Sequence, residues 1–490
     1  MNNKTPIRNI PLDPPPCESY PESVAPVLDW SAAANSCPAW FRDAKFGIFF
    51  HWGPYCVPEY QNEWYSRTMY REDHPTHRYH EEKYGSIRQY GYKNFINEFT
   101  GEKFDPDEWV RLFLRAGAKY FIASAEHADG FSMWDSKVNP CNCVNYGIGR
   151  DVLMELKEAA VRKDMRFGAS LHHSWNWGWF CSTDPLADVY NPQNELFYGK
   201  PVPYSASKDF PTYIMPDDDF QKNWLEKCKE VVDKVMPDIL YFDGRLYVIE
   251  EKYRLEFAKY YLEKARAAGK ESLVTYKDKD WGEEAGMLDF ECRWMPDILP
   301  LPWQLDDKSL WRTWSYVRDA QHKTSAQLIH QLADIVSKNG NFLLNVGPRK
   351  DGSFDDETVK VLHTIGDWMK VNGEAVYDTR PFNVYGEGPT KQNTDSGISL
   401  PEQLLDFTPQ DIRFTQKKGA VYAIVLGWPK DRKVTIKTLG CGGCLTARPR
   451  RVTMLGYDGE LPFEQSREGL IVSLPANPPC PEAFSLKVEC

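Results

Sequence analysis

The sequence predicts a (β/α)8 barrel followed by a smaller antiparallel β-sandwich, and three observations lead to this prediction. Short runs of β-branched and aromatic residues recur as far as Gly347, and amphipathic helical segments separate most of them. Polar side chains follow one run after another at the same end. Beyond residue 380 the helical segments give way to short alternating runs. A length of 490 residues exceeds the usual size of one domain, which agrees with a large domain and a smaller one.

Seven segments have the composition of buried parallel strands. They are Phe46–His51, Tyr120–His127, Arg166–His173, Asp238–Asp243, Ser272–Lys277, Met287–Glu291 and Phe342–Gly347. A closed barrel of this class needs eight strands. We place the remaining strand at Leu310–Tyr316, where WRTWSY is apolar but weakly patterned.

The predicted helices begin and end at recognisable residues. Asp105 is an N-cap acceptor before a proline, and Glu108 places a carboxylate in the first turn. Gly117 suits the left-handed end of that helix, and Thr324 with Gln327 predicts a capping box. Further segments with apolar residues at three- and four-residue spacing are Arg150–Lys163, Phe220–Val235, Glu251–Ala268, Ser325–Lys338 and Thr358–Val371. These helices are long enough to cover the outside of a barrel.

The last part of the chain predicts a separate β-sandwich. Its stretches are rich in glycine and proline, and the runs Val421–Leu426, Lys433–Ile436 and Leu470–Leu474 follow one another without helices between them. We therefore divide the chain into a barrel at residues 1–384 and a sandwich at residues 385–490.

Composition excludes several classes of partner. A net charge of −11 and a pI near 5.5 disfavour nucleic acid and anionic membranes, because both require a basic surface. Residues 1–20 contain no apolar signal segment, and no run of 18 apolar residues occurs. We expect a soluble cytoplasmic protein. Most of its 12 cysteines should be free thiols. A homo-oligomer is compatible with the sequence. Cys441 and Cys444 form the only CxxC motif, and no second pair or nearby histidine completes a zinc set.

Polar residues at the carboxyl ends of the predicted strands are the main functional signal. In a (β/α)8 barrel these ends converge on one mouth, where the active site lies. Charged groups near a barrel core reduce stability unless something uses them. We therefore predict the site from the strand-end residues, which are His51, His127, His172, His173, Asp243, Lys277, Glu291 and Asn345.

Two of these residues are carboxylates on different strands. Asp243 follows five residues of buried-strand character, which suits a nucleophile or general base, although an Asp that caps the turn at Gly244 is the alternative. Glu291 lies in a similar position, and Asp289 shares its strand face. Paired carboxylates are the minimum apparatus for glycoside hydrolysis, and their separation, which the sequence does not give, decides between retention and inversion.

The histidines favour sugar binding over metal binding. His51 and His127 are neutral hydrogen-bonding groups at pH 7, suited to sugar hydroxyls. Metal hydrolases on barrels commonly use two histidines spaced by one residue on a single strand, whereas adjacent His172 and His173 point to opposite faces. We therefore expect no metal and no other cofactor. Trp52, Trp64 and Trp134 lie near the strand ends and are candidates for stacking walls.

Six segments, in order along the chain, resemble glycoside hydrolase family 29, the α-L-fucosidases. They cover residues 40–65, 116–137, 149–168, 236–244, 287–298 and 335–354, and residues 411–429 extend the resemblance into the tail. The combination of FGIFFHWG, EHADGF and NFLLNVGPRKDG is specific to this family.

The resemblance implies a retaining mechanism on terminal α-L-fucosides of an oligosaccharide or glycoconjugate, with a covalent glycosyl-enzyme intermediate. It identifies Asp243 as the nucleophile and Glu291 as the acid/base, with Glu283 and Glu284 as alternatives. It also implies four ligands of the sugar and an aromatic residue before the nucleophile, which are His51, Glu63, Trp64, His127 and Tyr241. We add Lys277, at the end of its strand, to the substrate-binding residues.

The chain departs from the family pattern at three positions. Ala128 stands where the family has a second histidine, His172 and His173 stand where it often has two tyrosines, and Arg245 follows the Asp-Gly pair. Either one of the two histidines replaces the absent family histidine, or the preferred sugar is not plain fucose. The first alternative is an α-L-galactosidase, because Ala128 makes room where the family has a histidine. Two further alternatives are a catalytically inactive carbohydrate-binding homologue that kept the barrel and the metal hydrolase disfavoured above.

Overall fold

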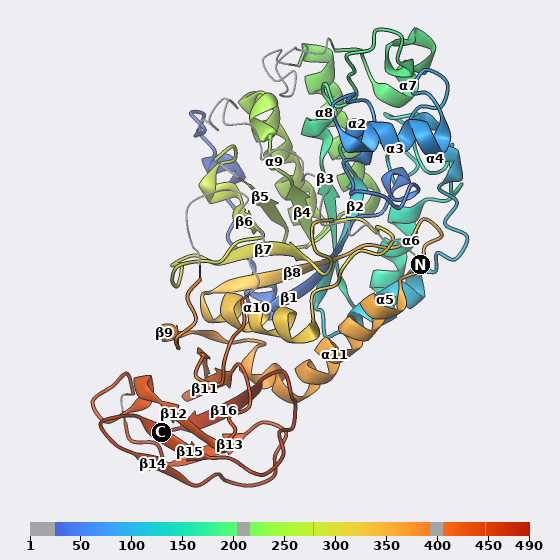
Figure 1. Ribbon diagram of the computed structural model, residues 1–490. Helices are drawn as coiled ribbons and strands as arrows, with labels where there is room; N and C mark the ends of the chain where they lie inside the picture. Colours follow the sequence, from blue (N-terminus) through green and yellow to red (C-terminus); the bar gives the residue numbers. More distant parts are fainter. Residues whose placement is uncertain (1–24, 203–215, 278, 393–404, 446) are drawn as a thin grey trace, which may run out of the picture.

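The structure is a computed structural model that describes residues 25–202, 216–277, 279–392, 405–445 and 447–490. Its main feature is a closed barrel of eight parallel strands in sequence order, and β1 pairs with β8 to complete the circle (Figure 1). The strands are β1 (Phe46–Phe50), β2 (Tyr120–Glu126), β3 (Arg166–Leu171), β4 (Ile239–Phe242), β5 (Leu273–Tyr276), β6 (Met287–Glu291), β7 (Trp303–Lys308) and β8 (Gly340–Val346). The predicted barrel is confirmed.

One strand lies elsewhere than predicted. The segment at Leu310–Tyr316 forms turns, and the strand between β6 and β8 is Trp303–Lys308, with the sequence WQLDDK. The sequence pattern did not reveal this strand because half of its residues are charged, yet every residue of β7 is buried. The two aspartates have partners on opposite faces of the strand. Asp306 accepts a hydrogen bond from the Tyr241 hydroxyl inside the barrel, and Asp307 accepts one from Lys323 outside it.

The covering helices begin and end close to the predicted residues. They are α5 (Pro106–Arg115), α6 (Val152–Arg162), α8 (Asp218–Val235), α9 (Glu251–Ala267), α10 (Ser325–Ser337) and α11 (Asp356–Asn372). The Asp105 carboxylate accepts from the backbone N–H groups of Asp107 and Glu108, and the capping box of Thr324 is formed. Gly117 follows α5 with a φ of 91°, as its left-handed position requires.

The connections after β1 and β3 build a cover over one side of the barrel. They contain α2 (Tyr65–Thr68), α3 (Pro75–Tyr84), α4 (Lys93–Glu98) and α7 (Glu195–Tyr198), whereas α1 (Ala39–Ala44) precedes β1. Figure 1 shows α2, α3, α4 and α7 together at the end of the barrel opposite the C-terminal sheets. Hydrogen bonds join the two connections, since the Tyr70 hydroxyl donates to Asp188 and Lys93 forms an ion pair with the same carboxylate.

The C-terminal part contains two antiparallel sheets over one apolar core, so the predicted sandwich is confirmed. One sheet has the order β13-β16-β11-β10-β9 and the other β12-β15-β14. The strands are β9 (Arg380–Glu387), β10 (Ile412–Lys417), β11 (Ala420–Val425), β12 (Lys433–Ile436), β13 (Arg451–Met454), β14 (Phe463–Gln465), β15 (Leu470–Ser473) and β16 (Phe484–Glu489). Side chains of both sheets, such as Phe414 and Leu470, are fully buried in this core. β9 crosses the boundary predicted at residue 385.

Large side chains fill the barrel below the mouth. Phe49, Ile122, Tyr241 and Leu343 belong to one buried cluster inside the strands. This packed layer lies beneath the polar side chains at the carboxyl ends of the strands. Among the described residues the cysteines form no disulfide, and no helix combines the length and apolarity needed to cross a bilayer.

Candidate active site

Every strand of the barrel contributes one polar side chain to its carboxyl-end mouth. Contacts among these side chains link them into one group, which consists of His51, His127, His172, Asp243, Lys277, Glu291, Asp306 and Asn345. All except Asp306 follow from the sequence argument. Asp306 was missed because its strand was not recognised.

Asp243 and Glu291 face each other across a single lysine. The Nζ atom of Lys277 lies 3.5 Å from Oδ1 of Asp243 and 2.6 Å from Oε2 of Glu291, so these two oxygens are at most about 6 Å apart. The carboxylates of retaining glycosidases are about 5–5.5 Å apart, and those of inverting enzymes about 6.5–9.5 Å. Both side chains remain accessible, with 20% and 25% of their surface exposed.

Lys277 is the centre of a buried charge cluster. Besides Asp243 and Glu291, its ammonium lies 3.3 Å from Asp306 and 4.0 Å from Asp289. Burial opposes the ammonium form, but the carboxylates, Asp306 foremost, hold the pKa of Lys277 above its ordinary value. Burial, reinforced by the charge of Asp306, raises the pKa of Asp289 well above the usual range. Asp289 is therefore readily kept neutral.

Replacing Lys277 by methionine is expected to lower the free energy of unfolding by about 3–5 kcal/mol, because it leaves the buried carboxylates without their cation. Chemical denaturation followed by tryptophan fluorescence measures this loss. The matched control is Lys222→Met, which breaks an ion pair with Asp218 on the surface of α8 and should leave the denaturation midpoint almost unchanged. Equal midpoints for the two variants would contradict the structural role of the cluster.

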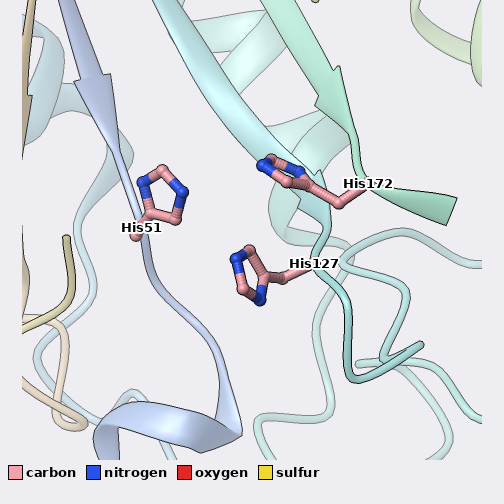
Figure 2. Close-up of side chains that lie close together, drawn as sticks. All are labelled: His51, His127 and His172. Carbon is pink, nitrogen blue, oxygen red and sulfur yellow. The ribbon is translucent and has the colours of Figure 1, made fainter. Parts of the chain in front are cut away.

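Three histidine rings converge beside the carboxylates. His51, His127 and His172 follow the adjacent strands β1, β2 and β3, and Figure 2 shows their rings turned toward one another. The ring centroids are 5.3 Å apart for His51 and His127, 5.6 Å for His51 and His172, and 4.7 Å for His127 and His172. His172 also approaches the nucleophile candidate, with 4.0 Å between its Nε2 and Oδ2 of Asp243.

Burial keeps these rings neutral. It lowers the pKa of His51 to about 4 and those of His127 and His172 well below the ordinary value. Asn345 fixes the proton of His51, because its amide nitrogen donates to the carbonyl of Trp314 and its oxygen therefore faces Nδ1 of His51 at 2.8 Å. The Nε2 atom of His51 is thus an acceptor.

His173 lies outside this group. Its Nε2 is 3.4 Å from Oε1 of Glu126, a fully buried carboxylate that also binds Lys227. Adjacent residues at a strand end point to opposite faces, so only His172 turns toward the mouth. Of these two histidines, the geometry therefore supports His172 as the replacement for the family histidine that is absent at Ala128.

The remaining predicted ligands line the mouth at different depths. Glu63 is buried and accepts from the backbone N–H of Trp314, whose ring lies 5.3 Å from that of His51. Trp64 packs 4.9 Å from Trp179, which in turn contacts His127. The Tyr241 hydroxyl, in contrast, donates to Asp306 inside the barrel.

Two of the predicted stacking walls are core residues instead. Trp52 packs against Phe99 and Phe104 below α4, and the Trp134 indole donates to Glu230. Sequence reasoning missed Trp314, which lies over the ammonium groups of Lys277 and Lys308. It lies in the segment that was mistaken for a strand.

Arg245 adopts a left-handed conformation just after the Asp-Gly pair, with a φ of 70°. Its guanidinium lies 5.4 Å from the ring of Trp175. This contact places a cation and an aromatic ring beside the loop that carries Asp243.

Glu283 and Glu284 lie at the opposite end of the barrel. Both are exposed, and the backbone N–H of Asn35 donates to the carbonyl of Glu284. The Asn35 side chain donates to the carbonyl of Ser272, the residue that precedes β5. The two glutamates are therefore near the amino ends of the strands, away from Asp243.

Comparisons with known proteins agree in both parts of the chain. Residues 23–374 match the family described as Alpha-L-fucosidase, and residues 405–489 match the Alpha-L-fucosidase C-terminal domain. The chain is 30% identical to tissue alpha-L-fucosidase of Rattus norvegicus, over 92% of this chain and 89% of that protein. It is 29% identical to the Homo sapiens tissue enzyme, over 92% and 88%. Among solved structures, Thermotoga maritima alpha-fucosidase in complex with fucose superposes with a TM-score of 0.74 and 26% identity, covering 95% of this chain and 100% of that one.

Proposed function

Because this glycoside hydrolase belongs to the α-L-fucosidase family, we propose that it is a retaining exo-enzyme that removes terminal α-L-fucose from oligosaccharides or glycoconjugates. The observation that carries the proposal is the pair of accessible carboxylates, at most about 6 Å apart, at the carboxyl-end mouth of the barrel. That separation is closer to the spacing of retaining enzymes than to that of inverting enzymes, which place a water between one carboxylate and the sugar.

The two carboxylates have different roles in this proposal. Asp243 attacks the anomeric carbon and forms the glycosyl-enzyme ester, while Glu291 protonates the departing glycosidic oxygen. Glu291 then takes a proton from the water that cleaves the ester. Glu291 must be neutral in the first step, and the ammonium of Lys277 then keeps an anionic partner because Asp306 lies 3.3 Å from it.

The neighbouring groups bind the sugar. Neutral His51 accepts from a hydroxyl through Nε2, and His127 and Glu63 supply further polar contacts. His172 stands beside His127 and takes over the sugar-binding role of the second family histidine, in whose position this chain has Ala128. The ring of Trp314 offers apolar surface for the C5 methyl group of fucose.

Hydrolysis of paired aryl glycosides tests the proposed activity. The full chain should release nitrophenol from 4-nitrophenyl α-L-fucoside faster than from the α-L-galactoside, which carries one additional hydroxyl on C6. A faster reaction with the galactoside would favour α-L-galactosidase activity, the second candidate function, which rests on Ala128 because its side chain is smaller than the histidine of the family pattern. The absence of product at high enzyme concentration would overturn the proposal and leave a carbohydrate-binding protein.

A further inference from the structure

The three histidines at the mouth present nitrogen atoms to one point. Each offers one ring nitrogen, and the three atoms lie within 4.8 Å of one another (Figure 2). They come from adjacent strands, whose spacing of about 4.8 Å brings equivalent side chains within reach of a common ion. His51, His127 and His172 are 4%, 6% and 3% exposed, so the neighbouring barrel strands restrict the positions of their rings.

Their nitrogen atoms have the chemistry of metal ligands. Nδ1 of His127 and Nδ1 of His172 are buried and make no hydrogen bond within the described part of the chain, so no such bond fixes which nitrogen of either ring carries the proton and which offers its lone pair. His51 donates through Nδ1 to the side-chain oxygen of Asn345. Its Nε2 atom therefore carries no proton, and the lone pair of this atom is held in a fixed direction. Metal-bound histidines commonly have such an outer partner for the other ring nitrogen. Neutral imidazole is the form that binds the metal.

The surrounding charges also suit a cation. Oδ2 of Asp243 lies 4.0 Å from Nε2 of His172 and is a carboxylate oxygen available for a fourth position. Lys277 is the cation that acts on both His51 and His172, and Glu291 and Asp306 offset its charge even without Asp243. Three neutral nitrogens and one carboxylate form a donor set typical of Zn²⁺.

We propose that His51, His127 and His172 bind one divalent transition-metal ion, Zn²⁺ foremost, and that the bound ion excludes the sugar. Zinc–nitrogen bonds of about 2.0–2.1 Å require the three nitrogens to approach to about 3.4 Å, a shift that small side-chain rotations achieve. The ion inhibits the enzyme, since His51 and His127 cannot hold the ion and sugar hydroxyls at once. Inhibition by the bound ion rests on the proposed function, whereas the metal site itself does not.

Calorimetric titration of the chelator-treated full chain with ZnCl2 tests the site. Cys441 and Cys444 are accessible thiols, so the titration uses a C441S/C444S background. One ion should bind per chain, and His172→Phe should weaken binding at least about tenfold. His363→Phe, on the exposed face of α11, is the matched control and should bind as the parent does. Asn345→Ala keeps all three ligands and should weaken binding about tenfold, because the outer partner of His51 is removed.

The outcomes separate the metal site from the proposed function. No binding by the parent, or equal binding by the His172 and His363 variants, overturns the metal site. Two results together support the metal site and the exclusion of the sugar: zinc binding is lost in His172→Phe, and zinc inhibits the parent in competition with the aryl fucoside. Zinc binding with non-competitive inhibition overturns the exclusion of the sugar. Zinc binding by a chain that hydrolyses no fucoside overturns the proposed function and leaves the metal site standing.

Discussion

Replacement of Asp243 by glycine is expected to lower kcat/KM on 4-nitrophenyl α-L-fucoside by a factor on the order of 10⁴ or more, because it removes the carboxylate that we propose forms the ester with the anomeric carbon. The fold should survive. The Asp243 side chain is partly exposed, and Lys277 keeps Glu291 and Asp306 as ion-pair partners. Steady-state kinetics and the thermal midpoint of the purified variant measure the two effects separately.

Azide and a surface variant complete that experiment. Azide is small enough to enter the space left by the Asp243 carboxylate and should restore turnover by attacking from the same side. Asp431→Gly removes an exposed carboxylate in the C-terminal part and should leave kcat/KM within about twofold of the parent, as surface changes do. An Asp243→Gly enzyme within tenfold of the parent would rule out this residue as nucleophile.

Replacement of Glu291 by alanine is expected to slow hydrolysis by about 10²–10⁴-fold on fucosides of simple alcohols, whose leaving oxygen needs a proton. Nitrophenol leaves without that assistance, so the first step on the aryl fucoside should be affected much less. Azide, which needs no general base, should accelerate the second step and yield a fucosyl azide of retained configuration. Kinetics on both substrates, with product analysis, measure this pattern.

Glu283→Ala and Glu284→Ala are the matched controls. Their side chains are exposed near the amino end of β5, and both variants should behave as the parent on every substrate. The assignment of Glu291 as acid/base would be wrong if either control variant lost more activity on alkyl than on aryl fucosides while Glu291→Ala did not.

The sequence predicted the architecture because most elements carry local signals. Buried strands such as β1 are continuous apolar runs, and caps such as Asp105 mark helix starts. β7 lacked that signal because three of its residues, Asp306 to Lys308, are charged, and their partners Tyr241 and Lys323 come from remote segments. Burial of a charged strand is a tertiary property that a local pattern does not contain.

The candidate site was predictable in its membership but not in its geometry. Strand-end position identified seven of the eight polar residues at the mouth, but adjacent His172 and His173 could not be told apart until β3 fixed which one faces inward. Glu283 and Glu284 remained alternative acids in the sequence because the loop before β6 runs the full height of the barrel. The sequence argument also considered only metal sites with two histidines on one strand, so it did not consider three histidines contributed by three different strands.

The most direct measurement is to trap the reaction halfway. A 2-deoxy-2-fluoro-fucosyl fluoride should react slowly with the enzyme and leave a stable glycosyl ester, which peptide mass spectrometry should locate on the tryptic fragment that contains Asp243. An unlabelled protein that still releases fucose, with the first product of inverted configuration, would contradict the account, as would an adduct on any other carboxylate.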